Sequence, residues 1–154
     1  MGNFKPDYTP IEMIKLGIFG GAYFNEPKIT YKTGYQWNHF VPQQFLRDLL
    51  SVNGRNKTVT SLFDKEFNMY KVTCGSDYDS WLGAGWICDL DPYGWFNWYI
   101  NYYYGRKCFD DDRQIQRWSQ FKSRHSGLLK RFPNSNKTKQ NLLHWGIDYN
   151  KIIL

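Results

Sequence analysis

Residues 92–105 read Pro-Tyr-Gly-Trp-Phe-Asn-Trp-Tyr-Ile-Asn-Tyr-Tyr-Tyr-Gly, and seven of the eleven residues from Gly94 to Tyr104 are aromatic. A stripe at the spacing i, i+3, i+4, i+7 consists of Trp95, Trp98, Tyr99 and Tyr102. That spacing is typical of one packed face of an α-helix. Asp91-Pro92 suits an N-cap and a first helical turn, and Gly105 suits a left-handed residue after the helix. We therefore predict a largely buried helix over residues 92–104, central to the fold.

The residues after Gly105 predict a second, basic helix. It should begin at the Asp110–Asp112 run, because carboxylates favour the positive end of the helix dipole. Its inner face is predicted to hold Ile115, Trp118 and either Phe121 or Lys122. A separate stripe consists of Arg113, Arg117 and Arg124. Ser126-Gly127 is expected to interrupt or end this helix.

Caps and apolar periodicity predict the remaining helices. Thr9-Pro10-Ile11-Glu12 has the pattern of a capping box, Pro42 opens another helix, and a last helix starts near Asn136. Residues 22–40 show no firm element, and residues 58–74 leave a short helix or a short strand open. The sequence thus predicts a mainly α fold: one compact domain over residues 1–154, with about five helices. Its aromatic-rich middle is irregular and leaves room for a short strand pair.

The composition is that of a globular protein with one core: 154 residues, 42% hydrophobic and 22% charged. No apolar run approaches the roughly 20 residues that a membrane span needs, and the N-terminus lacks a signal-peptide stretch. The cysteines are Cys74, Cys88 and Cys108, an odd number without a Cys-x-x-Cys pair. That pattern argues against a disulfide framework and a zinc site. We expect an intracellular protein of a reducing compartment, cytoplasm or nucleus, without a metal or cofactor.

The net charge of +6 comes entirely from one segment. Residues 105–139 hold ten Lys or Arg against three Asp, a net of +7, whereas the rest of the chain has a net of −1. Such asymmetry favours an anionic partner, either nucleic acid or another phosphate-bearing ligand. A solvated basic surface without a partner is the alternative.

Nucleic-acid binding is the first function that this segment predicts, because basic side chains neutralise phosphates and aromatic rings stack on exposed bases. The predicted binding residues are Arg106, Lys107, Arg113, Arg117, Lys122, Arg124, Tyr103, Tyr104 and Trp118. The stripe of four rings described above is assigned to the core instead, because its spacing is that of a packed face. For Tyr103 and Tyr104, core packing and ligand contact stay equally open.

A small enzyme is the second hypothesis, acting on a nucleotide, a nucleobase in nucleic acid or another small anionic substrate. Its catalytic residues would be Asp112, Arg113 and His125, with Arg106 beside them. Asp112 and His125 are thirteen residues apart, so they would not touch on one helix, and tertiary packing would have to assemble the site. In the alternative, Asp112 has a purely structural role: it pairs with Arg106 or caps the helix. A protein–protein interaction module, with surplus Tyr and Trp flanked by Arg, is the third hypothesis.

Several segments carry a family likeness. They are Gly85-Trp86-Ile87, Asp91-Pro92-x-Gly94-Trp95-Phe96-x-Trp98-Tyr99, Tyr102-x-x-Gly105-Arg106, Asp112-Arg113-Gln114-Ile115-x-Arg117-Trp118, and the shorter Thr9-Pro10-x-Glu12-Met13-Ile14-x-Leu16-Gly17 and Leu142-Leu143-His144-Trp145. Together they resemble a widespread uncharacterised family found in fungi, algae, bacteria and large viruses. The chain departs from it at Tyr93, commonly a basic residue, and at Lys107, commonly a second Arg. The resemblance implies a common fold and transfers no mechanism.

Overall fold

The computed structural model describes residues 4–75 and 78–153. In these residues eight α-helices form, six of them with seven residues or more. Their bounds are α1 Pro10–Leu16, α2 Pro27–Thr33, α3 Gln43–Ser51, α4 Tyr78–Gly83, α5 Trp95–Tyr103, α6 Asp111–Arg131, α7 Asn136–His144 and α8 Asn150–Ile153. Single 3-10 turns span Phe19–Gly21, Trp37–Phe40, Gly54–Lys57 and Lys65–Phe67.

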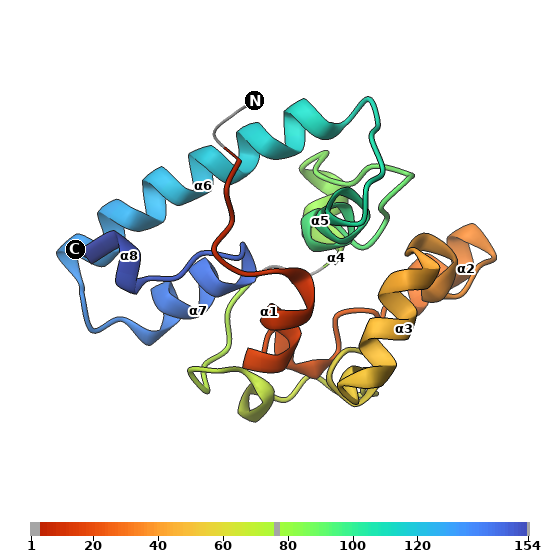
Figure 1. Cartoon of the computed structure of the whole chain (residues 1–154), viewed down its shortest axis with the longest axis horizontal. Coiled ribbons are helices and arrows are strands. Elements are labelled where there is room, and N and C mark those ends of the chain that lie inside the picture. The colour runs from red at the N-terminus through yellow and green to blue at the C-terminus, as the bar shows by residue number, and fades with distance from the viewer. Residues whose placement is uncertain (1–3, 76–77, 154) are drawn as a thin grey trace.

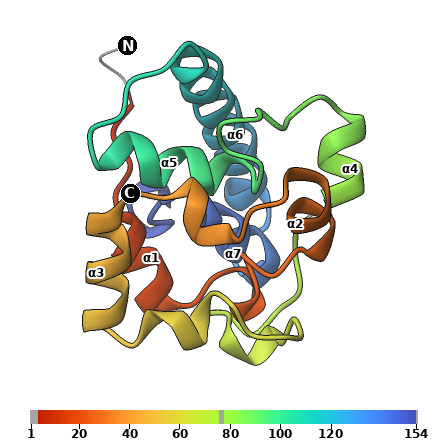
Figure 2. The ribbon, with the colours of Figure 1, turned by 90° about the vertical axis from the view of Figure 1, so that its right-hand side faces the viewer.

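The helices pack around α5 into one compact all-α domain. The long α6 lies along one side with α7 and α8 beneath it, and α2 and α3 form the opposite side (Figures 1 and 2). Helix α5 lies between them and packs against both α1 and α6. The described residues contain no β-strand, so the short strand pair that the sequence left open is not present there. The β-type pairing among these residues is limited to an isolated antiparallel bridge between Cys88 and Asp91.

The aromatic stretch occupies the centre of the core. Every residue from Asp91 to Asn101 is buried, which confirms the prediction of a central buried helix. Phe4, from the segment before α1, inserts its ring among five others at centroid distances between 5.1 and 6.2 Å. These rings belong to Trp95, Trp98, Tyr99, Tyr102 and Trp118. Most of them meet Phe4 edge to face, the geometry that the ring quadrupoles favour.

The start of α5 differs from the prediction. The helix begins at Trp95, three residues later than expected, and its N-cap is Gly94 with φ +102°. Asp91 is therefore not the capping residue. Its carboxylate is fully buried and pairs with Arg106 instead. The predicted cap at Asp91-Pro92 is wrong: these residues form a turn that precedes the helix.

The end of α5 confirms the predicted glycine cap. Gly105 has φ +106°, a conformation that side-chain-bearing residues rarely adopt. The Gly105 N–H donates to the Tyr102 carbonyl at 3.0 Å, and the Arg106 N–H donates to the Asn101 carbonyl at 3.0 Å. This pair of bonds is the Schellman motif, which satisfies carbonyls that the helix end leaves free. It also fixes the direction in which the chain leaves toward Arg106.

Helix α6 begins where predicted but does not end where predicted. It runs for 21 residues and passes through Ser126 and Gly127 without a break. A glycine in a helix interior costs roughly 1 kcal/mol. Leu129 lies beyond it and is fully buried, and burying such a side chain contributes about 1.5–3 kcal/mol. The burial of Leu129 therefore outweighs the cost of Gly127, and α6 is one continuous helix.

The sequence predicts some of the other helices and misses the rest. The capping box of α1 is formed: Thr9 N–H donates to the Glu12 carboxylate at 2.8 Å, and Glu12 N–H donates to the Thr9 hydroxyl at 3.2 Å. Helix α3 directly after Pro42 and helix α7 from Asn136 are confirmed. Helices α2, α4 and α8 were not predicted. Within α2 one residue, Ile29, is buried, so no apolar periodicity marks it.

Two expectations from composition have structural counterparts. In the part of the chain that the structure describes, no helix is both long enough and apolar enough to cross a membrane. Cys74, Cys88 and Cys108 are all free thiols.

Candidate functional site

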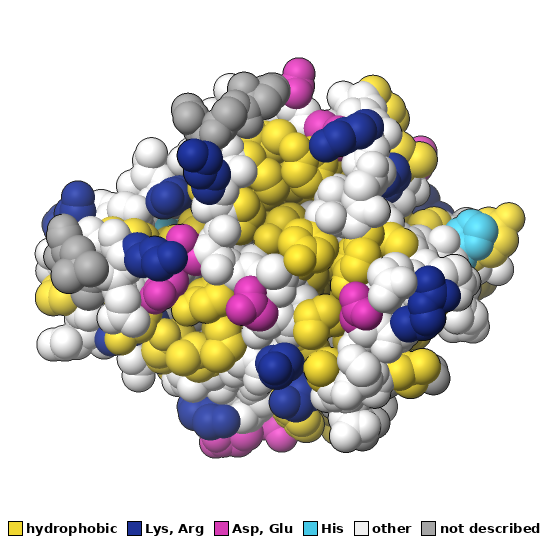
Figure 3. Space-filling view, in the orientation of Figure 1, with side chains coloured by type: hydrophobic (Ala, Val, Ile, Leu, Met, Phe, Trp, Pro, Cys, Tyr) yellow, Lys and Arg dark blue, Asp and Glu magenta, His cyan; other side chains and the backbone are white. Residues whose placement is uncertain are grey.

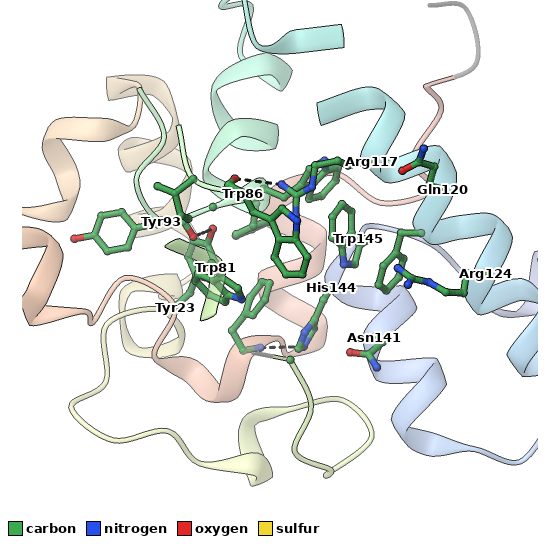
Figure 4. Close-up of a pocket in the computed structure, with 17 residues that line it drawn as sticks. Tyr23, Trp81, Trp86, Tyr93, Arg117, Gln120, Arg124, Asn141, His144 and Trp145 are labelled. Carbon is green, nitrogen blue, oxygen red and sulfur yellow. Dashed lines mark hydrogen bonds between the residues drawn. The ribbon is translucent and has the colours of Figure 1, made fainter. Parts of the chain in front are cut away.

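A cavity of about 440 Å³ opens between α6, the end of α7, α4 with the loop after it, and the turn at Phe19–Gly21 (Figure 4). Aromatic rings dominate its lining, including Phe19, Tyr23, Trp81, Trp86, Phe121 and Trp145. Its polar lining comes from Arg117, Gln120 and Arg124 on α6 and from Asn141 and His144 on α7. Among the described residues, no Asp or Glu lines it.

The aromatic walls are held in place by further rings. Trp145 stacks on Phe121 at 4.5 Å and 18°, and its ring also lies 4.6 Å from that of Trp95 in the core. On the other side of the cavity, Trp86 belongs to the loop after α4 and is 43% exposed. Trp86 is thus a partly exposed residue of the lining (Figure 4).

Arg117 lies between these two indoles. Its guanidinium carbon is 5.3 Å from the centre of the Trp86 ring and 5.4 Å from that of Trp145. It donates hydrogen bonds to the Gln114 amide oxygen at 2.9 Å and to the Trp86 carbonyl at 3.4 Å. In the described part of the chain it has no carboxylate partner. Burial, together with the positive charge of Arg113, lowers the pKa of Arg117 to about 10.

Three more polar side chains line the cavity beyond Arg117. Gln120 and Arg124 come from α6, and Asn141 comes from the facing helix α7 (Figure 4). Within the described residues, none of these three side chains makes a hydrogen bond or an ion pair. They are donors that a ligand could engage without breaking an existing contact.

His144 closes the cavity floor as a neutral imidazole. Its Nε2 atom accepts the Phe19 N–H at 3.1 Å and lies 2.9 Å from the Gln140 amide nitrogen. The other ring nitrogen faces the Cys74 thiol at 3.8 Å. Complete burial lowers the pKa of His144 to about 3, so the ring carries no charge at neutral pH. The described residues contain no group of three or more His, Cys, Asp or Glu placed to hold a metal ion.

Two of the predicted phosphate-binding arginines are held in ion pairs. Arg106 forms two hydrogen bonds to Asp91, at 2.8 and 2.6 Å, and Arg113 forms two to Asp110, at 2.6 and 2.9 Å. Asp91 and Asp110 are both buried. These pairs tie the ends of α5 and α6 to the core. The suggested pair between Asp112 and Arg106 is wrong, since Asp91 takes that position.

The predicted lysines and rings are also placed mostly in packing roles. Lys107 lies 4.2 Å from the Tyr102 ring and Lys122 lies 5.2 Å from the Trp118 ring. Trp118 is 3% exposed and donates its indole N–H to the Trp145 carbonyl. Its ring is therefore unavailable for stacking on a base.

The two tyrosines for which the sequence left core packing and ligand contact open differ in burial. The Tyr104 hydroxyl donates to the Asp48 carboxylate at 2.7 Å, and its ring is partly buried. Tyr103 is 49% exposed. Neither residue lines the cavity.

The structure does not assemble the predicted catalytic group. Asp112, Arg113 and His125 all lie on the continuous helix α6, where a thirteen-residue separation spans about 20 Å. Asp112 is exposed, and His125 stacks on Phe121 at 3.7 Å. Burial lowers the pKa of His125. These side chains cannot act on one substrate atom.

Of the predicted residues, Arg117 and Arg124 are the pair that lines the cavity. The rest of the lining was missed, because Trp81, Trp86 and Trp145 come from separate segments whose meeting depends on tertiary packing. A usable signal was the spacing of Arg117, Phe121 and Arg124 at i, i+4 and i+7, which places two arginines and a ring on one side of a helix. On the face shown in Figure 3, Lys and Arg side chains are scattered among hydrophobic ones rather than joined into one patch.

Comparison with protein-family models, curated proteins and solved structures finds no match for this chain. The family resemblance of its motifs stays a prediction.

Proposed function

We propose that the protein binds a nucleotide unit in this cavity, with the base against the indole walls and the phosphate held by Arg117 and Arg124. The observation that carries the proposal is the combination of aromatic walls and two arginines with no carboxylate among the described lining residues. Neither feature alone would suffice, because aromatic cavities also bind apolar or cationic ligands.

The size and walls of the cavity suit one planar ring system with a polar substituent. Its volume of about 440 Å³ falls within the range of about 300–1,000 Å³ that small-molecule sites occupy. Trp86 offers an indole face, and stacking a base on an aromatic side chain contributes about 1–3 kcal/mol. Trp145 is packed between Phe121 and Trp95 and offers its edge. Trp145 is held by Phe121 and Trp95, so little side-chain entropy is lost when a base binds there.

The charge of the lining favours an anion over a cation. A cationic ligand would meet Arg117 and Arg124 without a described carboxylate to offset the repulsion. A phosphate would instead give Arg117 the counter-charge that it lacks, and charge-assisted hydrogen bonds are about twice as strong as neutral ones. Burial already disfavours the charged form of Arg117, so a bound anion would raise its pKa again.

Isothermal titration calorimetry with the four ribonucleoside monophosphates, at low salt and pH 7.5, tests the proposal. We expect binding that Trp86→Ala and Arg124→Gln each weaken at least tenfold. Phe109→Ala and Lys130→Gln are matched controls, because Phe109 is 84% exposed, Lys130 is exposed, and neither lines the cavity. Absence of binding, or binding that Trp86→Ala leaves unchanged, would refute the proposal.

A further inference from the structure

The arginine row of α6 continues beyond the cavity. Arg117, Arg124 and Arg131 follow one another at intervals of seven residues. On an α-helix, seven residues advance about 10.5 Å and rotate by only about 20°. Because α6 is unbroken from Asp111 to Arg131, the three side chains lie on one stripe of the helix. The stripe starts inside the cavity and leads toward the C-terminal end of α6.

These three arginines are available to a ligand. None of them belongs to an ion pair in the described part of the chain. Arg124 and Arg131 are exposed, and the Arg131 guanidinium lies 5.4 Å from the ring of Phe132, which is itself 55% exposed. Arg113 begins the same stripe but is held by Asp110, so the open row begins at Arg117.

Helix α7 adds polar groups beside this row. It packs against α6, and its residues Lys137 and Asn141 are four apart, which places them on one face. Asn141 lines the cavity with Arg124, and Lys137 is exposed. Donors and positive charges therefore continue on both helices past the mouth of the cavity.

We propose that the ligand is a single-stranded nucleic acid, with one nucleotide in the cavity and the flanking phosphates along Arg124 and Arg131. This rests on the proposed function of the cavity. A cavity of about 440 Å³ holds one nucleotide, so neighbouring units of a strand have to lie outside it, where the arginine row continues. A single strand presents its bases freely, whereas a base in a duplex must first be unstacked at a cost of a few kcal/mol. The exposed ring of Phe132 beside Arg131 offers a second stacking surface.

The test compares a nucleoside monophosphate with a hexanucleotide of the same base by fluorescence anisotropy, competition and salt titration. We expect the hexanucleotide to bind at least tenfold more tightly. Arg131→Gln should weaken hexanucleotide binding three- to tenfold and leave mononucleotide binding unchanged. It should also reduce the slope of log K against log salt by about 0.7, the contribution of one phosphate contact on a single strand.

Lys130→Gln is the matched control. Lys130 is exposed like Arg131 and has the same charge, but it lies one residue earlier and therefore about 100° around the helix. Circular dichroism of both variants confirms folding. Equal affinity for mononucleotide and hexanucleotide, equal effects of the two variants, or preference for a duplex would overturn the strand proposal while leaving the cavity proposal intact. If neither ligand binds, the proposed function itself fails.

Discussion

Arg106 donates hydrogen bonds to Asp91 through both guanidinium Nη atoms, at 2.8 and 2.6 Å, and so joins the segment after α5 to the turn before that helix. The Asp91 side chain has no exposed surface, and that of Arg106 is 28% exposed. Asn101, on the last full turn of α5, adds a third hydrogen bond to the same carboxylate at 2.8 Å. The pair closes a loop around the aromatic helix and holds it in the core.

We expect Asp91→Asn to destabilise the fold by about 3–5 kcal/mol, because it leaves the Arg106 charge partly buried without its counter-charge. The pair between Lys28 and Asp79 is the matched comparison, since its side chains are 60% and 65% exposed. Asp79→Asn should change the free energy of unfolding by less than about 1 kcal/mol. Urea denaturation of both variants measures the difference, and equal effects would show that the Asp91 pair is not structural.

Two glycine substitutions should act in opposite directions. An added Cβ meets no atom within 4 Å at either Gly105 or Gly127, so steric space does not separate them. Gly127 lies inside α6, and Gly127→Ala should stabilise the protein by about 0.5–1 kcal/mol through the lower entropy of the unfolded chain. Gly105 has φ +106°, and Gly105→Ala should destabilise it by about 1–2 kcal/mol. Thermal unfolding of the two variants measures both effects. A shift of Tm with the same sign in both variants would contradict the backbone argument.

His144 should make the fold sensitive to acid. Its pKa is about 3 in the folded protein, against about 6.5 in an unfolded chain. As the pH falls from 6.5 to 3, the unfolded state binds a proton that the folded state does not. Stability is therefore lost over that window by up to about 1.4 kcal/mol per pH unit from this group. Burial lowers the pKa of His125 as well, so His125 contributes in the same direction.

Denaturant titrations between pH 7 and pH 4 measure this dependence. His144→Gln should have lower stability at pH 7 but a flatter pH profile. His39→Gln is the control for a histidine-to-glutamine replacement at an exposed site. A wild-type profile in His144→Gln would show that another group governs the acid response.

Nucleotide binding should weaken as the pH rises toward 10. The pKa of Arg117 is lowered to about 10 in the free protein, so about half of its charge is lost at pH 10, where most arginines keep theirs. Calorimetry with a nucleoside monophosphate from pH 7.5 to 10 should show a falling affinity. In Arg117→Gln the remaining affinity should no longer fall over this range, and a persisting fall would assign the effect to a different group.

The elements with strong local signals were predictable from sequence. The capping box at Thr9, the aromatic stripe of α5 and the Schellman glycine Gly105 all follow from rules that involve near neighbours. Helix α2 was not predictable in this way, because one of its residues is buried and its other side chains carry no pattern. The passage of α6 through Gly127 was missed because the burial of Leu129, a tertiary effect, overrides a local breaker.

The site was predictable to a lesser degree. The charge count pointed to the segment that contains Arg117 and Arg124, but it could not separate arginines that bind carboxylates from those that do not. The pair of Arg113 with Asp110 has a spacing of three residues and could have been inferred from the sequence. The pair of Arg106 with Asp91, fifteen residues apart across a buried helix, could not. The cavity brings together residues of the turn at Phe19–Gly21, of α4 and the loop after it, and of α6 and α7. No local sequence pattern encodes this arrangement.

The position of Phe4 has a consequence for how the chain reaches this fold. Its ring partners are residues 95–118, and the nearby Tyr8 carbonyl accepts the Tyr99 hydroxyl at 2.6 Å. The Asp7 N–H reaches still further along the chain, to the Gly146 carbonyl at 2.7 Å. During synthesis the first segment emerges long before these partners do. Contacts of such sequence separation form late and slow folding. We expect the aromatic rings of α5 to stay exposed during synthesis until the residues up to Gly146 have left the ribosome.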